Sequence, residues 1–295
     1  MSPAQQLLPG VAWYDIADPA SPTLDELAAK YNIHELQVED CRHGGQRAKA
    51  EEYEHYLFTV LKHIQKEDTL QFSDFSIFLG RNYLITVHAA PTSALLEKLV
   101  QRAKQQNVQR VDMLFYMLVD LLVDDYLALL DDLTVEISKI ESEVLQNPEP
   151  PVLRRIFRLK RRLIEFRRVA ANTRDVINQL IRREHGLLND DLDPYFRDVY
   201  DHVTRTVELI ETYRDLLTGS LDIYLSAVAN RTNQVMKVLT IWGTVALPLV
   251  IITGFFGMNL HLPWQDSRYG AVYALLVMLV SVVLVLLYFR RKKWF

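Results

Sequence analysis

Residues 238–259 read VLTIWGTVALPLVIITGFFGMN, and these 22 positions carry no formal charge. A second uncharged stretch of 21 residues, 269–289, follows after a short loop. At about 1.5 Å per helical residue, each stretch reaches about 30 Å, the thickness of a bilayer core. A buried helix of a soluble protein seldom runs so long without a charge. The sequence therefore predicts two transmembrane helices, at 238–259 and 269–289.

The basic residues around these spans predict their orientation. Residues 290–293, in the tail 290–295, are all Arg or Lys. In the loop at 260–268, the only charged residues are Asp266 and Arg268. Basic residues accumulate on the cytoplasmic side of a membrane. Because two spans form a hairpin, we expect both termini in the cytoplasm of a multi-pass protein of the cell membrane, with 260–268 outside.

The overall composition excludes several classes of function. The net charge of −4 does not favour nucleic acid as a partner. The single cysteine, Cys41, cannot form an intrachain disulfide and suits a reducing compartment. We find no phosphate-binding loop and no arrangement of nucleophile and base. An enzyme is therefore not expected.

The first 110 residues predict a cytoplasmic α/β domain. Strand-like runs rich in β-branched and aromatic residues lie at Val11–Ile16, 56–64, 74–79 and Tyr83–His88. Residues 80–82, Gly-Arg-Asn, predict a hairpin turn between the last two strands. Helices are expected at 23–31 and 93–106.

Residues 111–193 predict a region of long helices, and 194–237 predict a stalk that leads into the membrane. Helices at 111–146 and 152–185 are separated by Asn-Pro-Glu-Pro-Pro at 147–151. From Pro194 onward, apolar residues recur every three or four positions. If this third helix continues to Phe256, its roughly 62 residues form a rod of about 93 Å. Such a rod is a mechanical link between a sensor and a gate, or only a stalk.

The first span is more polar than the second. It carries three threonines, two internal glycines and a proline: Thr240, Thr244, Thr253, Gly243, Gly254 and Pro248. Small and polar residues at membrane depth favour either contacts between helices or a water-filled path. One hairpin cannot enclose a pore, so conduction requires a ring of several copies.

The end of the first span carries the sequence Gly257-Met258-Asn259, preceded by NRTNQVMKVLT at 230–240. Together with YFRDVYDH at 195–202 and VEDCRHGGQRAK at 38–49, these segments resemble the CorA family of divalent metal-ion transporters over essentially the whole chain. The resemblance implies a homopentamer in the lipid bilayer with a funnel-shaped cytoplasmic domain. It implies channel-like transport of hydrated Mg²⁺, and also Co²⁺ or Ni²⁺, driven by the membrane potential.

The resemblance also implies which residues surround the ion. Gly257, Met258 and Asn259 would form the selectivity filter. A ring of Asn259 amide oxygens would accept hydrogen bonds from the waters that Mg²⁺ retains. The pore-lining positions would be Asn233, Met236, Leu239, Gly243, Leu247, Val250 and Gly254. Met236, Leu239 and Leu247 would form an apolar stretch that closes by losing its water.

Regulation by cytoplasmic Mg²⁺ is a further implication of the resemblance. In the family, divalent ions bind between neighbouring cytoplasmic domains and favour a closed pore. The matching carboxylates are Asp40 and Asp198, with Glu39 and Asp120 as weaker candidates. Hard oxygen ligands suit Mg²⁺. Without the ion, like charges would face each other across the interface and push the subunits apart.

Some features leave alternatives open. Val250 stands where relatives can carry a pore-facing threonine, the loop after the signature lacks glutamate, and His261 lies beside the expected pore mouth. A transporter of Zn²⁺ or another transition metal is one alternative, and a membrane-anchored metal sensor that conducts nothing is another. The basic segment 154–168 reads as a solvated or paired helix face, with RNA or anionic lipid as less favoured partners.

Overall fold

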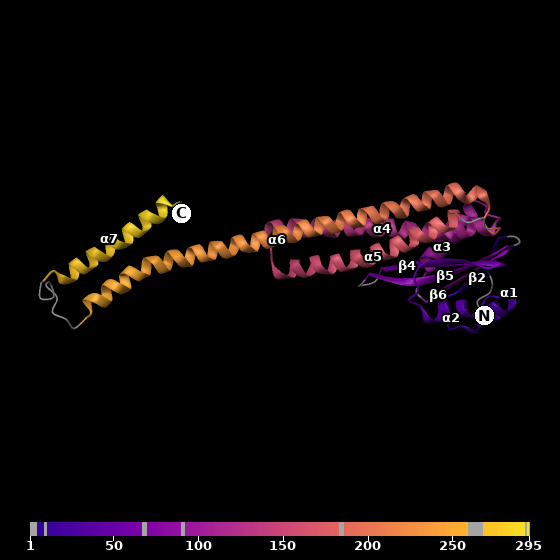
Figure 1. Ribbon diagram of the computed structural model, residues 1–295, viewed down its shortest axis with the longest axis horizontal. Coiled ribbons are helices and arrows are strands. Elements are labelled where there is room, and N and C mark those ends of the chain that lie inside the picture. The colour runs from indigo at the N-terminus through magenta and orange to yellow at the C-terminus, as the bar shows by residue number, and fades with distance from the viewer. Residues whose placement is uncertain are drawn as a thin grey trace. The chain divides into compact units, whose positions relative to one another are not determined.

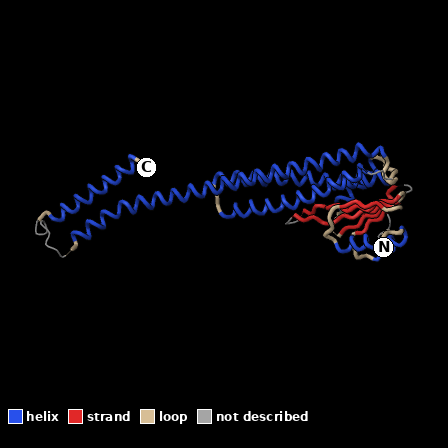
Figure 2. The backbone as a smooth tube through the Cα atoms, in the orientation of Figure 1, coloured by secondary structure: helices blue, strands red, loops and turns tan. Residues whose placement is uncertain are grey.

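The computed structural model describes residues 5–8, 11–66, 70–89, 92–182, 186–258, 268–292 and 294. The chain forms two compact units, Met1–Leu221 and Asp222–Phe295. The first unit combines a β-sheet with helices, and the described part of the second is almost entirely helical (Figures 1 and 2). This division differs from the residue 237/238 boundary expected between stalk and span, because the last buried contacts of the stalk end before that point. The segment boundaries expected from the sequence stay predictions.

The first unit is built on a six-stranded sheet with the strand order β1-β2-β6-β5-β4-β3. The strands are β1 (Gln5–Leu8), β2 (Val11–Ile16), β3 (Lys49–Glu52), β4 (Tyr56–Lys66), β5 (Leu70–Gly80) and β6 (Tyr83–His88). The predicted hairpin between β5 and β6 is confirmed, since the two pair antiparallel across Arg81 and Asn82. β2 pairs parallel with β6, and the other neighbours pair antiparallel.

Helices cover both faces of this sheet. Figure 1 shows α1 (Pro22–Tyr31) and α2 (Glu35–His43) on one side and α3 (Ser93–Gln105), α4 (Val111–Gln146) and α5 (Pro150–Arg182) on the other. Five consecutive residues of β4, Leu57 to Leu61, are buried for this reason. Phe58 and Phe78 pack with Leu24, Val38 and Cys41 beneath the first pair of helices. On the opposite face the Tyr126 hydroxyl of α4 donates a 2.8 Å hydrogen bond to the Lys62 carbonyl.

The cover of the second face consists of α3, α4 and α5. The predicted break between the last two is confirmed, because residues 147–149 lie between them. Apolar residues at three- and four-residue spacing form the buried stripe of α5, among them Ile156, Leu159, Leu163 and Phe166. The expected final residues of this helix, 183–185, lie outside the described residues.

A short 3₁₀ helix, η1 (Asp190–Leu192), leads into α6 (Asp193–Phe256), which runs unbroken for 64 residues. The predicted long helix is therefore confirmed. Its first part packs on the other long helices through Phe196, Val199, Val203, Ile210 and Leu217, which are all buried. Pro248 lies inside the helix without ending it.

The second unit contains the remainder of α6 and α7 (Gly270–Arg291). The most apolar 18-residue windows of these helices have mean hydropathies of 2.1 and 2.8. Most of the large apolar side chains in the described part of this unit are exposed in the single chain. Both helices are thus long and apolar enough to cross a membrane.

Candidate ion pathway and metal site

The seven residues expected to line a pore occupy one face of α6. At about 100° per residue, their positions fall within about 120° of one another around the helix axis. Every one of them is exposed, and Leu239, Leu247 and Val250 retain 64%, 61% and 65% of their surface. No other part of the described chain covers this face, which we call the open face.

The opposite face of the same segment is partly covered. Its half-buried residues recur at spacings of three and four: Ile241, Val245, Pro248, Leu249, Ile252 and Phe256. Next to this face, the Lys237 ammonium lies 6.0 Å from the ring centroid of Trp294, beyond the end of α7. The chain therefore covers one side of the helix and leaves the open face for lipid, water or another copy.

The threonines of the first span are satisfied within the helix. The hydroxyls of Thr240, Thr244 and Thr253 donate to the carbonyls of Met236, Thr240 and Leu249 at 2.8, 2.8 and 2.9 Å. A hydroxyl bonded in this way is compatible with an apolar environment. The polar content of the span alone therefore does not require a water-filled path, and the position of the open face is the stronger indication.

The helix ends at the signature tripeptide. The Gly257 amide donates to the Thr253 carbonyl at 2.9 Å, and the Met258 amide donates to the Phe255 carbonyl at 3.3 Å. A Cβ on Gly257 would lie 3.1 Å from that same Thr253 carbonyl, which favours glycine at this position. Asn259 and His261, which were expected to lie at the pore mouth, fall outside the described residues.

The four expected metal-binding carboxylates lie in the first unit in different surroundings. Asp40 of α2 is half-buried and its Oδ2 accepts a 2.7 Å hydrogen bond from Lys49. Glu39 and Asp198 are exposed, the latter with 65% of its side-chain surface accessible. Asp120 of α4 is buried, and its Oδ2 lies 2.6 Å from Arg102. Within the described chain, no ion pair or hydrogen bond joins Asp40 to Asp198.

A different group of side chains is brought together between α4 and α6. One ligand atom each from Asp120, Asp124 and His202 lies within 4.8 Å of the other two. The Nδ1 of His202 is buried and has no hydrogen-bond partner among the described residues, and its Nε2 lies 3.9 Å from Asp198. Two carboxylates and an imidazole form a suitable donor set for a divalent ion.

The raised pKa of Asp124 is consistent with a site that a bound cation would stabilise. Burial raises this pKa above its ordinary value, and the charge of Asp120 raises it further. Arg102 offsets only part of the effect. Metal binding would displace the proton that this environment favours, so affinity at this cluster should rise with pH.

Sequence reasoning included Asp120 but missed Asp124 and His202. The signal was present, because Asp120 and Asp124 are four residues apart on α4, and Asp198 and His202 are four apart on α6. Each pair lies on one helix face. Which two faces meet depends on how the helices pack, and spacing alone does not reveal that.

The fold and these features define a two-span membrane protein whose large polar unit carries a cluster of metal-ligand type. Residues 9–291 match the family described as CorA-like Mg²⁺ transporter protein. The chain is 38% identical over 272 residues to the cobalt/magnesium transport protein CorA of Thermotoga maritima, covering 90% of this chain and 77% of that protein. The chain belongs to the CorA family, a family of transporters.

Two further relatives agree with this assignment. The putative metal ion transporter YfjQ of Bacillus subtilis is 30% identical, covering 97% of this chain and 91% of that protein. The solved structure of the CorA magnesium transporter from Methanocaldococcus jannaschii superposes with a TM-score of 0.87 at 26% identity. That match covers 97% of this chain and 92% of the other. The similarity therefore extends through both units.

Proposed function

We propose that this chain forms a channel-like transporter of hydrated divalent cations, with Mg²⁺ as its principal ion. The observation that carries the proposal is the open face of α6, which is uncovered while the chain's own residues partly cover the opposite side. In a ring of copies, these faces would surround a common axis. Five copies, as the family resemblance implies, would each contribute one such face.

The chemistry of the open face suits an ion that keeps its water. Amide oxygens at Asn233 and Asn259 accept hydrogen bonds from coordinated waters without the strong binding of a carboxylate ring. Leu239 and Leu247 lie between these two levels and would close the path by excluding water. Since moving one charge across 100 mV is worth about 2.3 kcal/mol, a divalent ion entering the cell gains about twice that.

The orientation proposed here places both termini in the cytoplasm. Arg290, Arg291 and Lys292 follow the apolar part of α7 directly, and basic residues stay on the cytoplasmic side. The cell interior is negative, so the proposed flux is inward. The large unit Met1–Leu221 then senses the cytoplasmic ion concentration.

Regulation by that concentration is part of the proposal. Asp40 and Asp198, unconnected within one chain, would bind Mg²⁺ between neighbouring subunits, and the Asp120–Asp124–His202 group would add a second site. The carboxylates of Asp40 and Asp120 each use Oδ2 for a basic partner, which leaves Oδ1 as a ligand. Oxygen donors of this kind fit Mg²⁺.

A second candidate ion class follows from His202. An imidazole beside two carboxylates suits Co²⁺, Ni²⁺ or Zn²⁺ better than a site made only of oxygen. Transition-metal transport with the same architecture is therefore the alternative. Competition between these ions and Mg²⁺ in one flux assay separates the two, because the principal ion is the one that blocks uptake of the other at lower concentration.

The proposed function is tested by divalent uptake into lipid vesicles that contain the purified protein and an internal magnesium indicator. Uptake should depend on a potential that is negative inside. Asn259→Ala should abolish it by removing the amide ring, while the size of the assembly stays unchanged on gel filtration. Undiminished uptake by this variant would contradict the assignment of the filter.

A further inference from the structure

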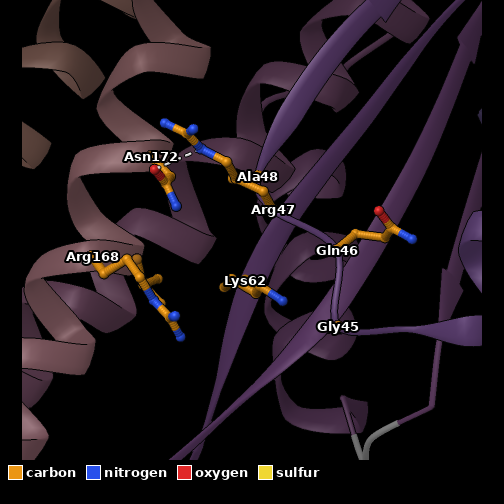
Figure 3. Close-up of a pocket in the computed structure, with 8 residues that line it drawn as sticks. Gly45, Gln46, Arg47, Ala48, Lys62, Arg168 and Asn172 are labelled. Carbon is orange, nitrogen blue, oxygen red and sulfur yellow. Dashed lines mark hydrogen bonds between the residues drawn. The ribbon is translucent and has the colours of Figure 1, made fainter.

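A cavity of about 410 Å³ lies between the loop that follows α2, strand β4 and helix α5. Figure 3 shows the side chains of Lys62, Arg168 and Asn172 around this space, with Arg47 on the loop. All of these residues belong to the first unit, and none takes part in the proposed ion path or metal sites. The cavity therefore needs a separate explanation.

The lining is cationic. Arg47, Lys62 and Arg168 contribute three positive charges, and no carboxylate lines the cavity in the described part of the chain. The charge of Lys62 is compensated, because its ammonium pairs with Asp74 and both side chains are mostly buried. The two arginines account for the remaining positive charge.

The two arginines differ in how they are held. Arg47 Nε donates a 2.9 Å hydrogen bond to Asn172 Oδ1, drawn as a dashed line in Figure 3, and its Nη2 lies 3.9 Å from Asp175. Arg168 makes no hydrogen bond or ion pair with any described residue. Three arginines of the same helix are paired with glutamates, Arg155 with Glu143, Arg162 with Glu136 and Arg167 with Glu211. Among the arginines of this helix that have no ion pair in the described chain, Arg168 is the one that lines the cavity. Arg168 thus presents an uncompensated guanidinium to the cavity.

Asn172 adds a hydrogen-bond donor to the cavity. Because Asn172 Oδ1 accepts from Arg47, its amide nitrogen is left to donate. The loop approaches through Gly44 and Gly45, whose φ values of 61° and 71° favour glycine, and a Cβ at either position would meet no atom within 4 Å. The loop side of the cavity is therefore open, and a ligand with several acceptor oxygens would find donors on both sides.

We propose that this cavity binds a soluble oligophosphate anion through Arg47, Arg168 and Asn172. Guanidinium groups recognise phosphate by paired, charge-assisted hydrogen bonds. No aromatic side chain lines the described cavity, so recognition is directed at phosphoryl groups and not at a nucleobase. The volume accommodates more than one phosphoryl group.

The test is calorimetric titration of inorganic pyrophosphate into the full-length protein in nanodiscs of zwitterionic lipid. The buffer contains no divalent metal, because pyrophosphate would otherwise bind the metal in solution. The wild type should bind at a single saturable site. Since a hydrogen bond to a charged group contributes about 1.5–3 kcal/mol, Arg168→Gln should weaken binding roughly tenfold or more.

Arg158→Gln is the matched control. Arg158 lies on the same helix, is exposed and has no ion pair among the described residues, yet it does not line the cavity. Its variant removes the same charge and should bind like the wild type. The proposal is overturned by absent saturable binding in the wild type, by equal weakening in Arg158→Gln, or by sulfate binding as tightly as pyrophosphate.

Discussion

Three aspartate carboxylates of the first unit lie in different environments: those of Asp40, Asp120 and Asp198. Asp40 and Asp120 are already bonded to Lys49 and Arg102, whereas Asp198 is exposed and its one ion-pair partner among the described residues, His202, lies 3.9 Å away. In the described part of the chain, a cation arriving at Asp198 competes with no Lys or Arg side chain at hydrogen-bond distance. Among the three, Asp198 is therefore the residue at which removal of the negative charge should have the clearest effect on regulation by Mg²⁺.

We predict that Asp198→Asn weakens the inhibition of uptake by internal Mg²⁺, raising the half-inhibitory concentration by roughly tenfold. The variant keeps the shape but loses the negative charge that attracts the ion. Uptake into vesicles loaded with graded Mg²⁺ measures this shift. Asp201→Asn, at a residue that is also exposed and lies three positions along the same helix, is the control. Unchanged inhibition in Asp198→Asn would remove this residue from the regulatory site.

At the scale of elements, the long helices were predictable because their apolar residues repeat every three or four positions and Pro or Gly marks their ends. The lengths of two strands were underestimated: β4 and β5 each extend to 11 residues, because their pairing with each other continues as far as Lys66 and Leu70. α2 and β3 were not predicted. Both are short and polar. α2 forms because its residues Val38 and Cys41 pack in the core against the sheet, and β3 forms by antiparallel pairing with β4.

Hydrogen bonds to Asp112 connect the start of α4 to the residue that precedes η1. Buried Asp112 accepts hydrogen bonds from Arg110 and from the Asn189 side chain, both at 2.6 Å. Burial alone would raise the pKa of Asp112, but these hydrogen bonds and the Arg110 charge lower it below its ordinary value. The start of α6 is thereby tied to the start of α4.

We predict that Asp112→Asn lowers the free energy of unfolding by about 1–2 kcal/mol, because the hydrogen bonds lose their charge. In the wild type, the contribution should be complete above about pH 4, the range of an unfolded aspartate. It should be lost as the pH falls through the lower pKa of the folded state. Thermal unfolding in detergent at pH 7 and at acid pH measures both effects; equal stability of the two proteins at pH 7 would contradict them.

At the scale of the whole molecule, the sequence predicted the apolar spans and the family, but not the arrangement of side chains from distant segments. The Asp120–Asp124–His202 group and the cavity beside Arg168 both combine residues that lie far apart in the chain. Periodicity shows which face of a helix is buried but not which element packs against that face. For the same reason, the parallel pairing of β2 with β6 could not be predicted from the sequence.

The open face predicts assembly. An exposed apolar stripe that also carries Asn233 and two glycines is poorly matched to lipid alone and suits contact with copies of itself. Native mass spectrometry of the protein released from detergent should give a particle of five 34.3 kDa chains. A monomer or dimer under conditions that preserve uptake would contradict a pore made from five open faces.

The chain offers a direct way to distinguish the two faces of α6. Its single cysteine, Cys41, is only 6% exposed, and burial raises its pKa to about 12, so it should not react with thiol reagents. A cysteine introduced at Leu247 would lie on the open face, and one at Leu249 would lie on the partly covered face. The two variants differ by only two positions along the helix.

The most direct measurement is therefore divalent uptake before and after treatment with a charged, membrane-impermeant thiol reagent. Leu247→Cys should lose its uptake on modification, because the added group occupies a water-filled path. Leu249→Cys and the wild type should keep theirs. Uptake that survives modification of Leu247→Cys, or that is blocked instead in Leu249→Cys, would show that the open face does not line the ion path.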